Sequence, residues 1–178
     1  MGTTPIFGFP YPDPSDLVAN YPALGQQLAE DVEDEFVSPG KIIQIVQATD
    51  TTYRSTTSAV FVDVGFSITI TPQFSTSKVL LMSNMLVDNF MTGAASIRCE
   101  FGITDASNNF IVAGNLGTDK VTYTANASLF ANQTLVGYAT PGTTSATTYK
   151  LRYAINNGTA QIRNDLVTGR LFAMEVTA

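Results

Sequence analysis

From Lys41 onward, apolar and polar residues alternate in nearly every segment, and this pattern limits the folds open to the chain more than any other feature. Ile68 and Ile70, for example, alternate with threonines, which places apolar side chains on one face of a strand. Runs of this kind recur at short intervals, with turn residues between them. We therefore expect an all-β head over residues 41–178, an antiparallel β-sandwich or jelly roll of about ten short strands.

Three details of the head follow from the same pattern. Gly65 is expected to turn the chain between two strands, and Asn157-Gly158, the strongest hairpin signal, to join two paired strands. Residues 78–88 are apolar at most positions, which predicts a long central strand buried on both faces. We expect Leu80 of that strand, and Leu171 of the closing strand, to lie in the core.

Residues 1–40 have a different composition, rich in proline, turn residues and acids, and are expected to form a docking arm. Four prolines within residues 5–14 predict an extended, irregular segment without a hydrogen-bond ladder of its own. Phe7, Phe9 and Tyr11 lie two residues apart, so an extended chain points them to one side. We interpret them as anchors for a partner's groove, since a floppy tail, the alternative, is usually poor in aromatic residues.

A short amphipathic helix is expected to follow, starting near Pro22 and ending at Pro39-Gly40. Its apolar stripe has four-residue spacing and completes the expected partner-docking set: Leu24, Leu28, Val32 and Phe36. Acids crowd its last turns, where they oppose the helix dipole, so we expect the helix to pack against the head or a neighbouring copy. These acids lack calcium-loop spacing and indicate a solvated face.

The residues needed for most enzymatic chemistry are missing. The chain has no histidine, one cysteine and no phosphate-binding glycine loop, so triads, His-based metal sites and nucleotide motifs are excluded. Cys99 is expected to be a small buried residue of a strand. The remaining enzymatic option is a carboxylate pair, with Asp63, Asp88, Glu100, Asp105, Asp119, Asp165 and Glu175 as candidates. Nothing in the sequence pairs two of them, so we expect no enzyme, cofactor or metal.

Charge and hydropathy argue against two classes of partner. The net charge is −6 and the nine basic residues form no cluster, which disfavours nucleic acid and anionic membranes. No apolar run approaches the ~18 residues of a membrane-spanning helix. Residues 1–20 lack the basic start and apolar run of a signal peptide, so we expect the chain to be made in a cytoplasm.

Two blocks carry a resemblance to a known group of proteins. The first comprises Phe7-Gly8-Phe9-Pro10-Tyr11-Pro12, Ser15-Asp16-Leu17-Val18 and residues 24–34. The second comprises Lys41-Ile42-Ile43-Gln44-Ile45-Val46, Phe61-Val62-Asp63-Val64, Ile68-Thr69-Ile70-Thr71-Pro72, Ser77-Lys78-Val79-Leu80-Leu81 and residues 171–176 around Met174-Glu175. Together they cover both ends of the chain, and they resemble bacteriophage virion proteins of the tail-fibre, minor-tail and head-decoration kind.

The resemblance implies a particular assembly. The first block is similar to the N-terminal segments with which such proteins begin, and the second to the β head at the C-terminus of many phage fibres. Such proteins are commonly homotrimers. The chain is short for a whole fibre and has no shaft repeat, which favours a capsid decoration, a head fibre or a small tail-associated spike.

We therefore expect a non-enzymatic virion structural protein, made in the bacterial host's cytoplasm, that docks through residues 1–40 on capsid or tail proteins. The alternative is a host-receptor head of a tail fibre that binds a surface glycan through a loop face with Tyr123, Tyr138 or Asn132.

Overall fold

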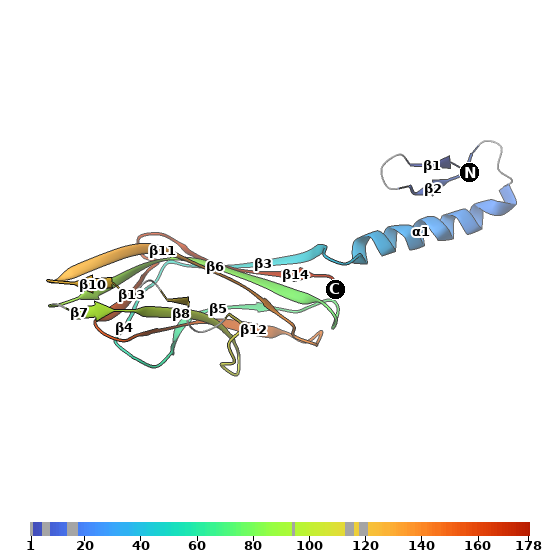
Figure 1. Cartoon of the computed structure of the whole chain (residues 1–178). Helices are drawn as coiled ribbons and strands as arrows, with labels where there is room; N and C mark the ends of the chain where they lie inside the picture. Colours follow the sequence, from blue (N-terminus) through green and yellow to red (C-terminus); the bar gives the residue numbers. More distant parts are fainter. Residues whose placement is uncertain (1, 5–7, 14–17, 94, 113–115, 118–120) are drawn as a thin grey trace.

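The computed structural model describes residues 2–4, 8–13, 18–93, 95–112, 116–117 and 121–178. An elongated β body carries a helix that projects from one end and continues its long axis, with a small hairpin beside the helix (Figure 1). The N-terminal elements are β1 Gly2–Thr3, β2 Pro10–Tyr11, a 3-10 turn Val18–Asn20 and α1 Tyr21–Val37. The body contains β3 Ile42–Asp50, β4 Tyr53–Thr56, β5 Val62–Ile70, β6 Lys78–Met91, β7 Ala95–Ile97, β8 Cys99–Asp105, β9 Leu116–Gly117, β10 Val121–Tyr123, β11 Ala127–Ala139, β12 Thr147–Ile155, β13 Thr159–Arg163 and β14 Gly169–Val176.

Two antiparallel sheets form the sandwich within the described residues. The larger has six strands. Five are bonded in the order β3-β14-β6-β13-β4, and the sixth, β11, pairs with the edge of β6 opposite to β14 and β13. The smaller has four strands in the order β5-β12-β8-β9, and β7 pairs separately with β10. The expected all-β sandwich preceded by an arm and one helix is therefore confirmed.

Alternate residues of the strands fill the space between the two sheets. The core includes Val64, Phe66, Ile68, Ile70, Val79, Leu81, Met85, Val87, Cys99, Phe101, Ile103, Leu135, Tyr149, Leu151, Tyr153, Ile155, Ile162, Leu171 and Ala173. This period of two is the pattern seen in the sequence, so the apolar half of each strand accounts for the sandwich.

The long strand β6 is buried on one face, which corrects the expectation of burial on both. Val79 and Leu81 point inward and have no exposed surface, whereas Leu80 is only partly buried and Asn84 is exposed on the outer face. The placement of Leu80 in the core is therefore wrong, and that of Leu171 is confirmed. An apolar run alone does not reveal which face of a strand is covered.

Gly65 does not turn the chain, because β5 runs through it as one strand. Its φ is +74°, and the register of the neighbouring strand shifts opposite it, between Lys150 and Arg152. The position is a bulge. A left-handed backbone suits glycine in a bulge as well as in a turn, which explains the wrong assignment.

Asn157-Gly158 does not close a hairpin either. It connects β12 of the smaller sheet to β13 of the larger one, so the chain crosses the sandwich here. Gly158 has a φ of +77°, and a Cβ at this position would lie 2.6 Å from the carbonyl oxygen of Phe90. The sequence signal specifies the backbone of the turn but not the partner of the following strand.

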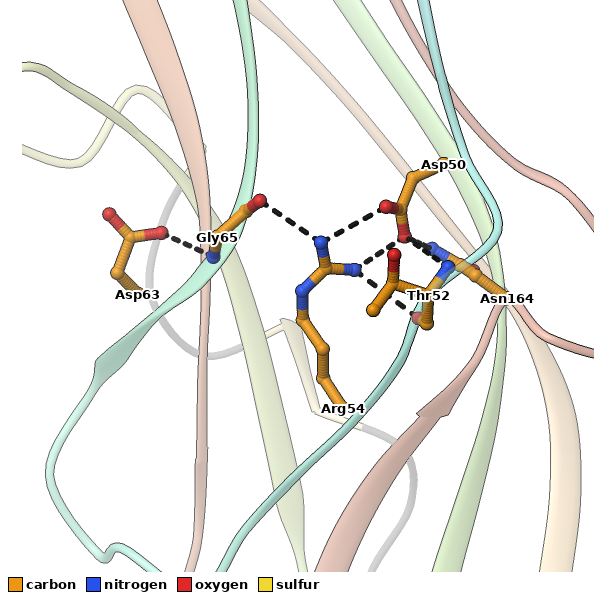
Figure 2. A network of polar contacts seen from close by, with 6 residues as sticks. All are labelled: Asp50, Thr52, Arg54, Asp63, Gly65 and Asn164. Carbon is orange, nitrogen blue, oxygen red and sulfur yellow. Dashed lines mark hydrogen bonds and ion pairs between the residues drawn. The ribbon is translucent and has the colours of Figure 1, made fainter.

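Arg54 of β4 bonds Asp50 at the end of β3 and ties the larger sheet to the smaller one through Gly65 of β5 (Figure 2). Its Nη1 and Nη2 donate to the Oδ2 and Oδ1 of Asp50 at 2.5 and 3.0 Å, and Nη2 also donates to the carbonyl of Gly65 in β5 at 3.1 Å. Asp50 also accepts hydrogen bonds from Asn164 Nδ2 at 2.7 Å and from the backbone N–H of Thr52 at 3.3 Å. Both oxygens of a partly buried carboxylate are thus satisfied.

This network fixes the charge of Asp50. Burial alone would raise the pKa of the carboxyl, but the hydrogen bonds from Arg54, Asn164 and Thr52 and the charge of Arg54 together lower it below its ordinary value. Because the folded chain then binds fewer protons at Asp50 than the unfolded chain, the carboxylate stabilises the fold at pH values above the ordinary Asp pKa of about 3.9. That stabilisation is lost as the pH falls through the lower, folded-state pKa.

A first prediction concerns the core. Leu171→Ala should lower the free energy of unfolding by about 2–5 kcal/mol, because it leaves a cavity between the sheets. Leu166→Ala, at a turn position with 58% exposure, should change it by no more than ~0.5 kcal/mol. Urea unfolding of the full-length chain measures both. Equal losses would contradict the assigned burial.

A second prediction concerns acid stability. Asp50→Asn should weaken the fold at neutral pH and flatten the further loss of stability below about pH 4, because the titrating group is gone. Asp34→Asn, at an exposed position of the helix, serves as the control. The midpoint of unfolding is measured as a function of pH from neutral to below about pH 4. The curves of the control and of the unaltered chain should be parallel. A curve of Asp50→Asn that is parallel to them would refute the assignment.

Candidate functional site

The candidate docking region begins with α1, whose limits follow from its sequence. Asn20 precedes the helix without a side-chain capping bond, and proline occupies the first turn, where a missing N–H costs nothing. At the other end, Ser38 Oγ donates to the carbonyl of Asp34 at 2.8 Å. Gly40 then turns the chain with a φ of +83°. The expected start and end of the helix are confirmed.

The helix stands largely outside the β body (Figure 1). Within the described residues it packs mainly against β2 and the preceding 3-10 turn. Of the apolar stripe, Leu28 is 38% exposed and Leu24 and Val32 are partly buried. Phe36 lies in the last turn, and its side chain is outside the described residues. At 17 residues, with an opposed dipole, such a helix gains little stability from itself.

The arm forms a small hairpin beside the helix, where an irregular segment was expected. Gly2 pairs with Tyr11 and Thr3 with Pro10, and Thr4 N–H donates to the carbonyl of Phe9 at 2.9 Å. The expectation of no ladder is therefore wrong. Proline removes one donor but leaves its carbonyl free, and neighbouring residues supply the rest of the short ladder.

Two of the three aromatic docking candidates lie within the described residues. Phe7 lies outside the described residues, Phe9 is partly buried and Tyr11 is 48% exposed. The Tyr11 ring lies so close to Gly2 that a Cβ there would meet it at 2.3 Å. Tyr11 therefore sits on the hairpin strand β2 and Phe9 directly precedes it, next to the helix, which places arm and stripe in one region.

The C-terminal segment anchors the point where the helix joins the body. Thr177 N–H donates to the carbonyl of Lys41 at 2.9 Å, and its own carbonyl accepts from Gly40 N–H at 2.8 Å. Lys41 N–H in turn donates to Thr177 Oγ1 at 3.0 Å. Lys41 Nζ forms an ion pair with Glu35 in the last turn of the helix. Hydrogen bonds on both sides of Lys41 thus hold the junction.

The candidate carboxylates occupy separate places, with one exception. Asp63 bonds Gly65 N–H, Asp105 bonds Asn109, Glu100 pairs with Arg98, and Asp119 lies outside the described residues. Asp88 and Asp165 share Arg163, at 4.0 and 3.1 Å. Among the described side chains, no three His, Cys, Asp or Glu gather around a point that could hold a metal ion.

Cys99 is fully buried in β8, as expected. Burial, and next the nearby charge of Glu100, raise the pKa of its thiol to about 12. The thiolate, which is the reactive form, is therefore scarce at neutral pH.

Glu175 is a structural residue whose place the sequence did not reveal. It has no exposed surface, and its Oε1 accepts the N–H groups of Gln73 and Phe74 at 2.8 and 3.1 Å. It thereby fixes the loop between β5 and β6 beside the helix junction. Its only sequence signal is an acid where the alternation of the last strand demands an inward residue.

The residues proposed for glycan binding lie mainly on β11. Tyr138 is 59% exposed and Asn132 is exposed on the same outer face, while the side chain of Tyr123 is outside the described residues. On this face the guanidinium of Arg163 lies between two rings, 5.5 Å from the centre of Tyr53 and 5.7 Å from that of Phe130. This aromatic cluster joins residues far apart in sequence, so only strand register reveals it.

No helix in the described part of the chain is long and apolar enough to cross a membrane.

Comparison with known proteins gives no family. No family model matches the chain, and no curated protein does. Among solved structures, a chain of infectious bursal disease virus strain Gx is 14% identical to this chain, with a TM-score of 0.37. The match covers 78% of this chain and 39% of the virus chain. Dimeric latent PorU from Porphyromonas gingivalis is 6% identical with a TM-score of 0.40, covering 75% of this chain and 13% of that one.

A third similar structure is the CBM22-1 xylan-binding domain of Paenibacillus barcinonensis Xyn10C. It is 13% identical with a TM-score of 0.32, covering 79% of this chain and 97% of that one. This chain spans well under half of the virus and PorU chains. TM-scores this low describe a partial likeness of the backbone, and nothing about the function of this chain follows from them.

A third prediction tests whether low intrinsic helix propensity limits the stability of α1. Gly25 lies inside the helix, and a Cβ there would meet nothing within 4 Å. Gly25→Ala should therefore stabilise the helix by about 1 kcal/mol. Gly40→Ala, where φ is positive, should weaken the junction instead. Circular dichroism of the full-length chain during thermal unfolding measures both effects, and a loss of helix in Gly25→Ala would contradict the geometry.

Proposed function

We propose that the chain is a non-enzymatic structural protein of a bacteriophage particle, a homotrimer that docks through residues 1–40 on a capsid or tail protein. The observation that carries the proposal is the position of α1, outside the β body and with its stripe partly exposed. A helix with so little support in one chain needs contacts from another chain to stay ordered. The number of copies is supported by the resemblance of both sequence blocks to phage fibre and decoration proteins.

The mechanism is the burial of apolar surface at two places. The stripes of three helices cover one another in a stalk, and the hairpin with Phe9 and Tyr11 fills a groove on the particle. Three copies of one weak docking segment act together, because the second and third contacts become intramolecular once the first has formed. Tight binding then requires no single strong contact.

The fourth prediction tests this proposal in two stages. Multi-angle light scattering of the full-length protein should give the mass of three 19.0 kDa chains. A monomer at every concentration would overturn the trimer. Phe9→Ser with Tyr11→Ser should keep the trimer but lower incorporation into particles at least tenfold, when supplied to phage that lack the chain.

Val18→Ser is the matched control, because Val18 is an apolar residue of the same arm with 74% exposure and lies outside the aromatic set. Its incorporation should be unchanged. Normal incorporation of the double variant would refute docking through these rings.

A second role, glycan recognition by the head as in a host-receptor tail fibre, is favoured by the cluster of Tyr53, Arg163 and Phe130. The two rings are 45% and 49% exposed and offer flat apolar surfaces against which the C–H face of a sugar packs. The fifth prediction is that the full-length chain binds host surface polysaccharide and that Phe130→Ala lowers the affinity about tenfold. Phe74→Ala, at an exposed ring near the helix junction, should not. A full-length chain without polysaccharide binding would exclude this role.

A further inference from the structure

The outer faces of the two sheets differ in chemical character. On the four-stranded sheet, the outward residues of β5 and β12 are polar. Ser67 and Thr69 alternate with buried residues, and Thr69 Oγ1 lies 2.7 Å from Thr148 Oγ1 of the neighbouring strand. Lys150 continues the polar row, so these two strands present water with hydroxyl and charged groups, as a solvated face does.

The six-stranded sheet presents two apolar rows on its outer face. Strand register sets the members of each row side by side across β3, β14, β6 and β11. The first row is Ile45, Met174, Leu80 and Tyr138, and the second is Gln47, Phe172, Met82 and Val136. The residues on the two outer strands are the most open, with Ile45 62%, Tyr138 59% and Val136 52% exposed. Seven of these eight residues are apolar, Gln47 being the exception, and we call the set the apolar rows.

The apolar rows are confined to one end of the sheet. The next row is Thr49, Arg170, Asn84 and Thr134, which is polar throughout. In the other direction lies the helix junction, where Pro39, Gly40, Lys78 and Val176 border a hollow of about 520 Å³ that Tyr138 also lines. The rows therefore occupy the part of the sheet nearest α1, and the polar row separates them from the aromatic cluster of Tyr53, Phe130 and Arg163 on the same face.

Resting on the proposed homotrimer, we propose that the apolar rows are the head part of the subunit interface and that each packs against a second copy of this chain. An apolar patch spanning four strands on a solvated face usually marks a contact surface. The rows are also continuous, through the hollow at the junction, with the helix that needs a partner of its own. Because α1 continues the long axis of the sheet (Figure 1), one symmetry axis can pass beside both surfaces.

Charge favours a second copy as the occupant. The chain carries a net charge of −6, so copies repel one another wherever acidic surfaces meet. The apolar rows contain none of the 15 acidic residues. Identical copies can therefore meet here without burying like charges, and burial of Ile45, Val136 and Tyr138 stabilises the contact.

The test uses the full-length protein. Ile45→Lys places a charge in the rows, and Thr49→Lys places the same charge on the same face of the same strand, four residues further on. Light scattering across a dilution series should show that Ile45→Lys raises the dissociation constant of the oligomer at least tenfold and that Thr49→Lys leaves it unchanged. Circular dichroism should show folded β structure in both.

A second measurement, cysteine labelling, introduces no charge into the apolar rows. Val136→Cys and Thr134→Cys lie on one strand and one face, and the native Cys99 is buried. Under the proposal, a maleimide reagent should label Val136→Cys at least tenfold more slowly than Thr134→Cys in the oligomer. The difference should vanish on dilution to monomers.

Each outcome bears on one proposal or the other. A wild-type chain that is monomeric overturns the homotrimer and this inference with it. A wild-type trimer in which Ile45→Lys assembles normally, or Val136→Cys labels as fast as Thr134→Cys, overturns the interface on the sheet and leaves a trimer held by the helix alone. Protection that appears only in assembled particles would assign the rows to a different protein and would also overturn the inference.

Discussion

The β body depends on the pairing of both edges of β6. One edge is bonded to β11 from Val79 to Met91, and the other to β14 over its first half and to β13 over its second. The inward apolar residues Val79, Leu81, Met85 and Val87 of this strand contribute to the core, and its other alternate residues lie on the outer face of the larger sheet. Its alternation therefore fixes the position of Leu81 between the sheets and of Leu80 in the apolar rows at once.

The sequence predicts the fold where the signal is local. Alternation identified the strands because a period of two is a property of neighbouring residues, and the spacing of Leu24 and Leu28 identified the helix. Gly65 and Gly158 show where this ends. Both were recognised as positions for unusual backbone geometry, and both have positive φ. Whether the chain then returns beside its last strand or crosses to another sheet depends on distant partners.

The candidate surfaces divide in the same way. The apolar stripe could be read from spacing alone, whereas the pairing of Gly2 with Tyr11 could not, because a proline-rich segment gives no strand signal. Ile45 and Tyr138 stand in one row although they are far apart in sequence, and only the registers of three strand pairs bring them together. The burial of Glu175 depends likewise on the loop that closes over it.

The hydrogen bonds of Thr177 with Gly40 and Lys41 determine how the molecule would respond to mechanical load. The helix joins the body at the start of β3, which lies antiparallel to β14 over eight paired positions, and β14 in turn lies beside β6. A pull on the helix along the long axis of the body is directed along these strands. Their hydrogen bonds would then be loaded together in shear, and not opened one after another as in a peeled hairpin. The short segment between the helix and this strand is also hydrogen-bonded to Thr177 on both sides of Lys41, so tension on the helix is shared between β3 and the C-terminal segment of the largest sheet.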